Sequence, residues 1–213
     1  MATKVKAKSS AKATTATSGQ KNTTGKQQKT LQDLLKEGLK DIYSAETQLF
    51  EAFPEMIEAC YNEDLQDAFT SHHQQTKRHI ERIEKVLRRL GIEKSEVESS
   101  KAMEGLIAEN KKILQEFEES PVRDSALIIG QQKIEHYEIA SYGSICELCD
   151  VLGQHNIGEL LGRTLAEEEE TDELLTELAM DINDEAFEMS EQDEEEEEDE
   201  ELETEEEEEE TEK

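Results

Sequence analysis

The chain has 213 residues, enough for one sizeable domain, and a formal net charge of −32 at pH 7. It contains no run of 18 apolar residues, and no apolar segment near its start, so the sequence predicts neither a membrane-spanning helix nor a secretory signal. Two Pro and no Trp suit a mainly helical body, and three Cys fit a reducing cytoplasm better than secretion.

Residues 1–30 carry seven Lys and no acidic residue, and they show no hydrophobic periodicity. This composition predicts a disordered basic tail. One interpretation is a lysine arm that binds DNA or another polyanion. The other is a solvated tail that contacts the acidic end of the chain, and the strongly negative net charge favours it because it opposes an approach to DNA.

The first long helix is expected from about Thr30 to Tyr61, with Thr30 as its N-cap and Asp33 in its first turn. Its buried side should consist of two heptad rows: Leu35, Ile42, Leu49 and Met56, and Leu39, Glu46, Phe53 and Cys60. Glu46 is therefore a carboxylate at a core position.

A second long helix is expected from about Asp64 to Leu90, where Gly91 is a natural C-cap. One of its core rows contains Leu65, His72, His79 and Val86. A single His on such a row is usually a hydrogen-bonded core residue. Two on one row, facing helices that also bury acids, favour metal ligation.

Residues 92–120 are less periodic and predict a short helix inside a crossover connection, closed by Pro121. A third long helix includes Leu127 to Leu152, and its periodicity is interrupted by acids. Glu138 lies in heptad register with Gln131, Ile145 and Leu152, and Glu135 lies one turn before it. Buried carboxylates are costly unless another group compensates them.

A fourth long helix is expected from about Asn156 to Ile182, with Glu168 in the core row of Leu161 and Leu175. Asp172 follows one turn later, and the other acids of 167–170 should face solvent. Residues 184–213 carry 21 acids and one Lys, which predicts a disordered polyacidic tail. Such a tail could gather cations, bind a basic partner, or simply keep the protein solvated.

Each of the four long helices thus places a ligand-type residue on its buried side, near its middle. Two divalent ions, iron or manganese, would neutralise such carboxylates, as in di-metal carboxylate bundles. The candidate ligands are Glu46, His72, His79, Glu135, Glu138, Glu168 and Asp172. The alternative is a metal-free bundle in which the acids are hydrogen-bonded to His72, His79 or Tyr142.

Several segments resemble the YciE/YciF family of bacterial stress-response proteins: DLLKEGLKDIYSAETQLFEAFPEM, HHQQTKRHIERIEKV, QKIEHYEIASYGS and TLAEEEETDELLTELA. The resemblance covers about residues 31–183 and is most specific around Glu135 to Tyr142. It implies an all-α, ferritin-like four-helix bundle, a homodimer, a bacterial cytoplasm and a metal site of undefined chemistry. Residues that match family-typical positions are Glu46, Glu135, His136, Glu138, Glu168 and Asp172. Gln74 and Gln75 depart from the pattern, because members often have Glu there and an amide is a weaker ligand.

These observations predict a basic tail over residues 1–30, a bundle over 31–183 and an acidic tail over 184–213. The leading hypothesis is a ferritin-like stress-response protein with a dinuclear metal site that handles peroxide or iron. The alternatives are a metal-free dimeric bundle that acts as a structural or interaction protein, and a DNA-associated ferritin-like protein that uses residues 1–30.

Overall fold

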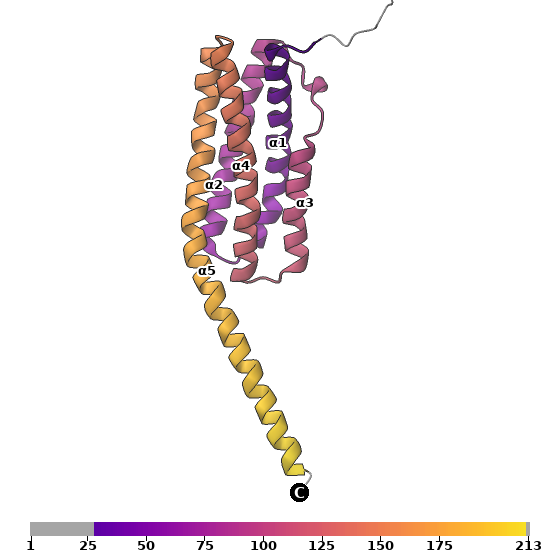
Figure 1. Ribbon diagram of the computed structural model, residues 1–213, viewed down its shortest axis with the longest axis vertical. Helices are drawn as coiled ribbons and strands as arrows, with labels where there is room; N and C mark the ends of the chain where they lie inside the picture. Colours follow the sequence, from indigo (N-terminus) through magenta and orange to yellow (C-terminus); the bar gives the residue numbers. More distant parts are fainter. Residues whose placement is uncertain (1–27, 212–213) are drawn as a thin grey trace, which may run out of the picture.

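The computed structural model describes residues 28–211, and side chains up to Glu191, so most of the basic tail lies outside the described residues. Within this range the chain forms five α-helices, one short 3-10 helix and no strand (Figure 1). The elements are α1 (Leu31–Ala59), α2 (Glu63–Leu90), η1 (Lys94–Glu96), α3 (Lys101–Glu116), α4 (Pro121–Val151) and α5 (His155–Thr211). The all-α, ferritin-like prediction is confirmed.

Four long helices form the bundle, and α3 lies outside them (Figure 1). Helix α1 packs against α2 and α4, α5 packs against α4 and α2, and α3 contacts α1 and α4. Because η1 and α3 lead the chain back along the bundle, α4 runs in the same direction as α2, and α5 runs in the same direction as α1. This long connection is the predicted crossover, and it allows all four core rows to face one another.

Capping side chains and glycine residues determine where the helices begin and end. The Thr30 hydroxyl accepts the Asp33 backbone N–H at 3.2 Å, and the Asp33 carboxylate accepts the Thr30 N–H at 2.9 Å, which forms a capping box. Gly91 and Gly153 follow α2 and α4 with φ angles of 66° and 68°, a left-handed conformation that glycine adopts without strain.

Asp124, in the first turn of α4, holds the connection between α1 and α2. Its fully buried carboxylate accepts the backbone N–H groups of Tyr61 and Asn62 at 3.0 and 2.6 Å. The neighbouring Arg123 donates to the carbonyl of Ala59 at 2.5 Å. These bonds satisfy backbone groups that the two helix ends leave free, and they fix this end of the bundle.

Helix α5 is longer than the sequence predicts. Its expected end near Ile182 marks the end of packing, because Ile182 is buried whereas Phe187 is 62% exposed, but the backbone stays helical to Thr211. No Gly or Pro occurs after Gly162 in this helix, and Glu is a good helix former. Figure 1 shows the extension projecting beyond the bundle. Disorder of the acidic tail in solution stays a prediction.

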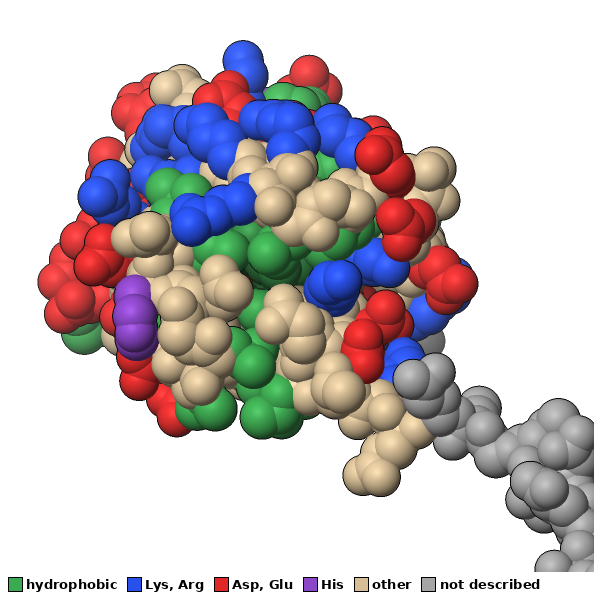
Figure 2. Space-filling model, turned by 90° about the horizontal axis from the view of Figure 1, so that it is seen from above, with side chains coloured by type: hydrophobic (Ala, Val, Ile, Leu, Met, Phe, Trp, Pro, Cys, Tyr) green, Lys and Arg blue, Asp and Glu red, His purple; other side chains and the backbone are tan. Residues whose placement is uncertain are grey.

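Charges are unevenly distributed over the surface. Figure 2 shows one end of the bundle, where Lys and Arg side chains gather along one edge and acidic side chains occupy much of the remaining rim. The last turns of α2 contribute exposed Lys85, Arg88 and Arg89 in the helix-end position where cations are favourable. None of the described helices is long and apolar enough to cross a lipid bilayer.

We expect a chain of residues 30–183 to retain the helical circular dichroism of its bundle and a cooperative melting transition. The reason is that burial ends at Ile182 and begins within α1. Thermal melting followed at 222 nm checks this boundary. A loss of cooperativity in the shortened chain would contradict it.

Gly130 of α4 leaves room for the Asn110 side chain of α3, and we expect Gly130→Ala to destabilise the fold by about 1–3 kcal/mol. A Cβ at this position would lie 1.7 Å from Oδ1 of the buried Asn110, so the Asn110 side chain must rotate or α3 must shift. Gly143→Ala in the same helix is the control, because its Cβ meets nothing within 4 Å, and it should stabilise by up to about 1 kcal/mol. Denaturant melts measure both, and Asn110→Ala should relieve the Gly130→Ala defect.

Candidate metal centre

Six ionisable side chains from all four long helices meet in the middle of the bundle. They form two groups of possible metal ligands: His72, Glu135, Glu138 and Glu168, and Glu46, His79 and Glu168. Within each group the ligand atoms lie within 4.8 Å of one another, and Glu168 belongs to both. Five of the six side chains are fully buried and His72 is 2% exposed, so the cluster is sealed from solvent.

The first group is organised around His72. Its Nε2 lies 3.1 Å from Glu135 Oε1 and 3.8 Å from Glu168 Oε2. Its Nδ1 faces away from the acids, 3.2 Å from Gln75 Oε1 and 3.3 Å from Thr171 Oγ1. Gln75 therefore contacts the far side of the imidazole and is not one of the candidate ligands.

The second group is organised around His79. Its Nδ1 lies 2.9 Å from Glu168 Oε1 and 3.4 Å from Glu46 Oε1. Its Nε2 lies 2.7 Å from Glu167 Oε2, on the outer side of the ring. The hydroxyl of the buried Tyr142 donates to Glu46, so one oxygen of that carboxylate is already hydrogen-bonded.

Many polar atoms of this cluster have no hydrogen bond of good geometry, although His72 Nε2 and His79 Nδ1 lie within ion-pair distance of the acids described above. They are Glu138 Oε1 and Oε2, Glu168 Oε1 and Oε2, Glu46 Oε2, Glu135 Oε2, His72 Nε2 and His79 Nδ1. Buried polar atoms without partners are rare and cost about 1–3 kcal/mol each. All eight belong to candidate ligands, and carboxylate oxygens with imidazole nitrogens are a donor set that iron and manganese accept. The residues present therefore fit a pair of metal ions.

The acids and histidines strongly perturb one another's protonation. Burial raises the pKa of Glu138 well above 4.5, and the nearby Glu46, Glu168 and Glu135 raise it further. Burial also raises the pKa of Glu168 to about 7, although His79 opposes this shift. Burial lowers the pKa of His72 and His79, but their carboxylate neighbours outweigh it and bring the values to about 9 and 11. Without metal, protons bound to these side chains neutralise part of the negative charge that metal ions would otherwise neutralise.

Asp172 is the one predicted ligand that the structure does not bring into the cluster. It lies at the surface side of α5, with Oδ1 3.6 Å from Nε2 of His136, whose side chain is 68% exposed. Thr171 occupies the inward position of that turn and contacts His72 instead. Four residues correspond to slightly more than one helical turn, so Asp172 is rotated outward relative to Glu168.

Two residues that support His79 were not identified from the sequence. Glu167 was expected to face solvent, yet its carboxylate contacts His79 and forms two hydrogen bonds with Arg82, at 2.7 and 2.8 Å. The Arg82 guanidinium, with a further contribution from His79, lowers the pKa of Glu167 to about 2. Arg82 lies one turn after His79 on α2, and this spacing is the signal that could have identified it.

The metal-free alternative accounts for part of the cluster. Glu46 has Tyr142 as a partner, and Gln131 Nε2 donates to Glu135 Oε1 at 2.6 Å. Neither oxygen of Glu138 has any partner among the described residues. Hydrogen bonding alone therefore leaves the buried carboxylate of Glu138 without a partner that offsets its loss of hydration.

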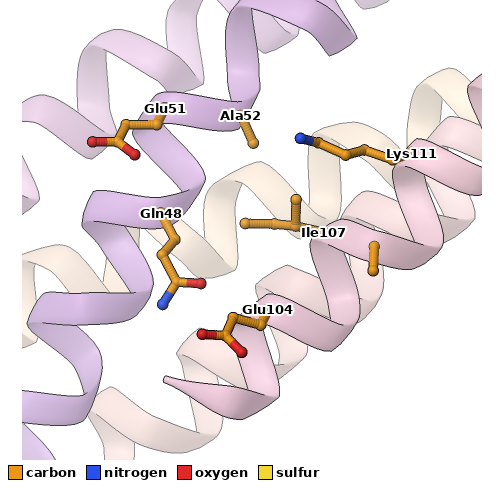
Figure 3. A pocket seen from close by; sticks show the side chains of 7 residues that line it. Gln48, Glu51, Ala52, Glu104, Ile107 and Lys111 are labelled. Carbon is orange, nitrogen blue, oxygen red and sulfur yellow. The ribbon is translucent and has the colours of Figure 1, made fainter. Parts of the chain in front are cut away.

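A pocket on the surface lies apart from this cluster, between α1 and α3 (Figure 3). Gln48, Glu51, Glu104 and Lys111 line it with apolar Ala52 and Ile107. These charged side chains are exposed, and no candidate metal ligand lines the pocket. Among the described residues, the candidate metal ligands thus cluster inside the bundle and not at this surface pocket.

Comparisons with known proteins agree with this fold. A family model described as a domain of unknown function, DUF892, matches residues 30–188. Protein YciF of Escherichia coli is 43% identical over 152 residues, which cover 71% of this chain and 92% of YciF. The crystal structure of this stress protein matches with a TM-score of 0.69 at 41% identity, covering 74% of this chain and 99% of YciF. YcfI from Rhodopseudomonas palustris matches with a TM-score of 0.67 at 38% identity, over 70% of this chain and 94% of YcfI.

Proposed function

The chain belongs to the DUF892 family and is similar to YciF, and we propose that it is a ferritin-like stress-response protein that binds two metal ions. The observation that carries the proposal is the sealed cluster of four carboxylates and two imidazoles, in which neither oxygen of Glu138 has a hydrogen-bond partner. A structural bundle without chemistry gains nothing from burying four carboxylates, because apolar residues of similar size would pack at lower cost.

The charge of the cluster supports two divalent ions rather than one. Glu46, Glu135, Glu138 and Glu168 carry up to four negative charges, and the two histidines are neutral when they bind metal. Glu168 lies in both ligand groups, and Glu138 has two free oxygens beside Glu46, Glu135 and Glu168. Glu168 would therefore contribute to both metal positions, and Glu138 would contribute to the position of His72.

Iron and manganese are the metals that this donor set favours, because it combines carboxylate oxygens with imidazole and contains no thiolate. When bound, such ions would supply redox chemistry with peroxide, or storage of the iron itself. The chain's own contribution is to hold the ligands, exclude water and keep the Tyr142 hydroxyl on Glu46. We place this activity in a cytoplasmic homodimer, as the family resemblance implies.

Elemental analysis of the purified full chain tests the proposal. Protein produced with added iron or manganese should contain about two metal ions per chain after desalting. Anomalous scattering at each absorption edge should locate one ion between α2, α4 and α5 and the other between α1, α2 and α5. Protein that binds neither metal under oxygen-free conditions would overturn the proposal and favour the metal-free interaction module.

A further inference from the structure

The two histidines of the cluster present different ring nitrogens to the acids. His72 directs Nε2 toward Glu135, whereas His79 directs Nδ1 toward Glu168 and Glu46. The nitrogens on the outer side of the two rings also differ in their surroundings. His72 Nδ1 meets the neutral groups of Gln75 and Thr171, and His79 Nε2 meets the charged carboxylate of Glu167.

Glu167 is held firmly in this position. Arg82 donates from both terminal nitrogens to the two oxygens of Glu167, and it also donates to the hydroxyl of Thr164 at 3.0 Å. Such two-point contacts between guanidinium and carboxylate fix orientation as well as charge. The side chains of Arg82 and Glu167 are only 16% and 23% exposed, which limits competition by water.

A carboxylate can only accept a hydrogen bond, so its contact with His79 determines which nitrogen carries the proton. At 2.7 Å from Glu167, Nε2 must be the donor. Nδ1 lies 2.9 Å from Glu168 and by the same rule also carries a proton in the metal-free chain. A bound metal would take the place of that Nδ1 proton, while the Nε2–H stays on Glu167. A second carboxylate behind a ligating histidine also raises the basicity of that ligand.

We propose that Glu167, clamped by Arg82, is a positioning residue that accepts the Nε2–H of His79 and turns the Nδ1 lone pair toward the metal. This inference rests on the proposed function for the presence of a metal. The hydrogen bond between His79 and Glu167, however, is present in the metal-free structure. It makes the two metal positions unequal, since the His79 position has an anionic partner behind its imidazole and the His72 position has a neutral one.

The first test uses the metal-free full chain, so it remains informative if no metal binds. In protein labelled with ¹⁵N-histidine, His79 should show a proton on Nε2 that exchanges slowly with water. Glu167→Ala should abolish this slow exchange. The matched control Glu170→Ala, which removes an exposed carboxylate from the same helix, should preserve it. An Nε2 without a proton in the parent protein would overturn the inference.

The second test measures manganese(II) affinity by competition with a metal-binding dye. Glu167→Gln should weaken binding about 10–100-fold at one position, as loss of an outer-sphere partner does elsewhere. Glu170→Gln makes the same change in net charge at an exposed site and should leave affinity within twofold.

A double-mutant comparison separates positioning from a general structural role. If Glu167 acts through His79, Glu167→Gln should have no further effect in a His79→Ala background, and its full effect in a His72→Ala background. Equal losses in both backgrounds would overturn the inference. A parent chain that binds no manganese would instead contradict the proposed function and leave the inference to be decided by the ¹⁵N experiment.

Discussion

Manganese(II), or iron(II) without oxygen, should raise the melting temperature of the full chain by several degrees. A ligand that binds only the folded state at a hundredfold excess over its Kd stabilises it by about 2.7 kcal/mol. In a domain of this size each kcal/mol shifts the melting temperature by about 2–4 °C. Calorimetry with and without metal measures the shift, and calcium, which prefers more oxygen ligands, is the control ion.

Glu138→Leu should abolish most of this rise and leave the metal-free protein equally or more stable. The raised pKa of Glu138 means that its ionised form destabilises the fold, at a cost that is absent below the ordinary pKa of 4.5 and grows as pH rises above it. Leucine removes that cost and fits the row of Ile145, which is also buried. Glu147→Leu, at an exposed position of the same helix, should leave the metal-dependent shift unchanged.

The contrary result is equally clear. If Glu138 had hydrogen-bonding partners in the folded protein, its loss would leave them unpaired and cost about 1–3 kcal/mol. A destabilised Glu138→Leu chain, together with no metal-dependent shift in the parent, would contradict the metal-binding proposal.

The buried acids could be identified from the sequence because a heptad row reports which side of a helix faces the core. Glu46, Glu138 and Glu168 replace apolar residues in rows that are otherwise buried, and all three are fully buried in the structure. The boundaries near Thr30, Gly91 and Gly153 follow from capping chemistry that depends only on neighbouring residues.

The periodicity of the sequence does not predict how one helix is rotated against its neighbour. Asp172 and Glu167 both lie within one turn or so of Glu168, and only the rotation of α5 against α2 decides which of them reaches His79 rather than the exposed His136. The end of α5 was missed for a different reason. Hydrophobic periodicity reports where packing stops, at Ile182, whereas a polyglutamate segment can continue as helix without any core to face.

His79→Ala should reduce the metal content from about two ions per chain toward one, whereas His136→Ala should have little effect. His79 is fully buried with Nδ1 between Glu46 and Glu168, but His136 is exposed and contacts only Asp172 among the described acids. Removal of the imidazole leaves that metal position with carboxylates alone, which weakens binding of an ion that accepts nitrogen ligands. Elemental analysis after dialysis against micromolar manganese measures the difference.

Asp172→Asn is a further control, because the sequence predicts Asp172 as a ligand whereas the structure places it outside both ligand groups. If the bundle is assembled as described, this change removes an acid one turn from Glu168 without touching either ligand group, so the metal content should stay at the parent level. Circular dichroism must show that all three variants remain folded. A loss of metal in Asp172→Asn or His136→Ala that exceeds the loss in His79→Ala would mean that α4 and α5 turn a different face toward the centre, and the ligand assignment would then have to move to that face.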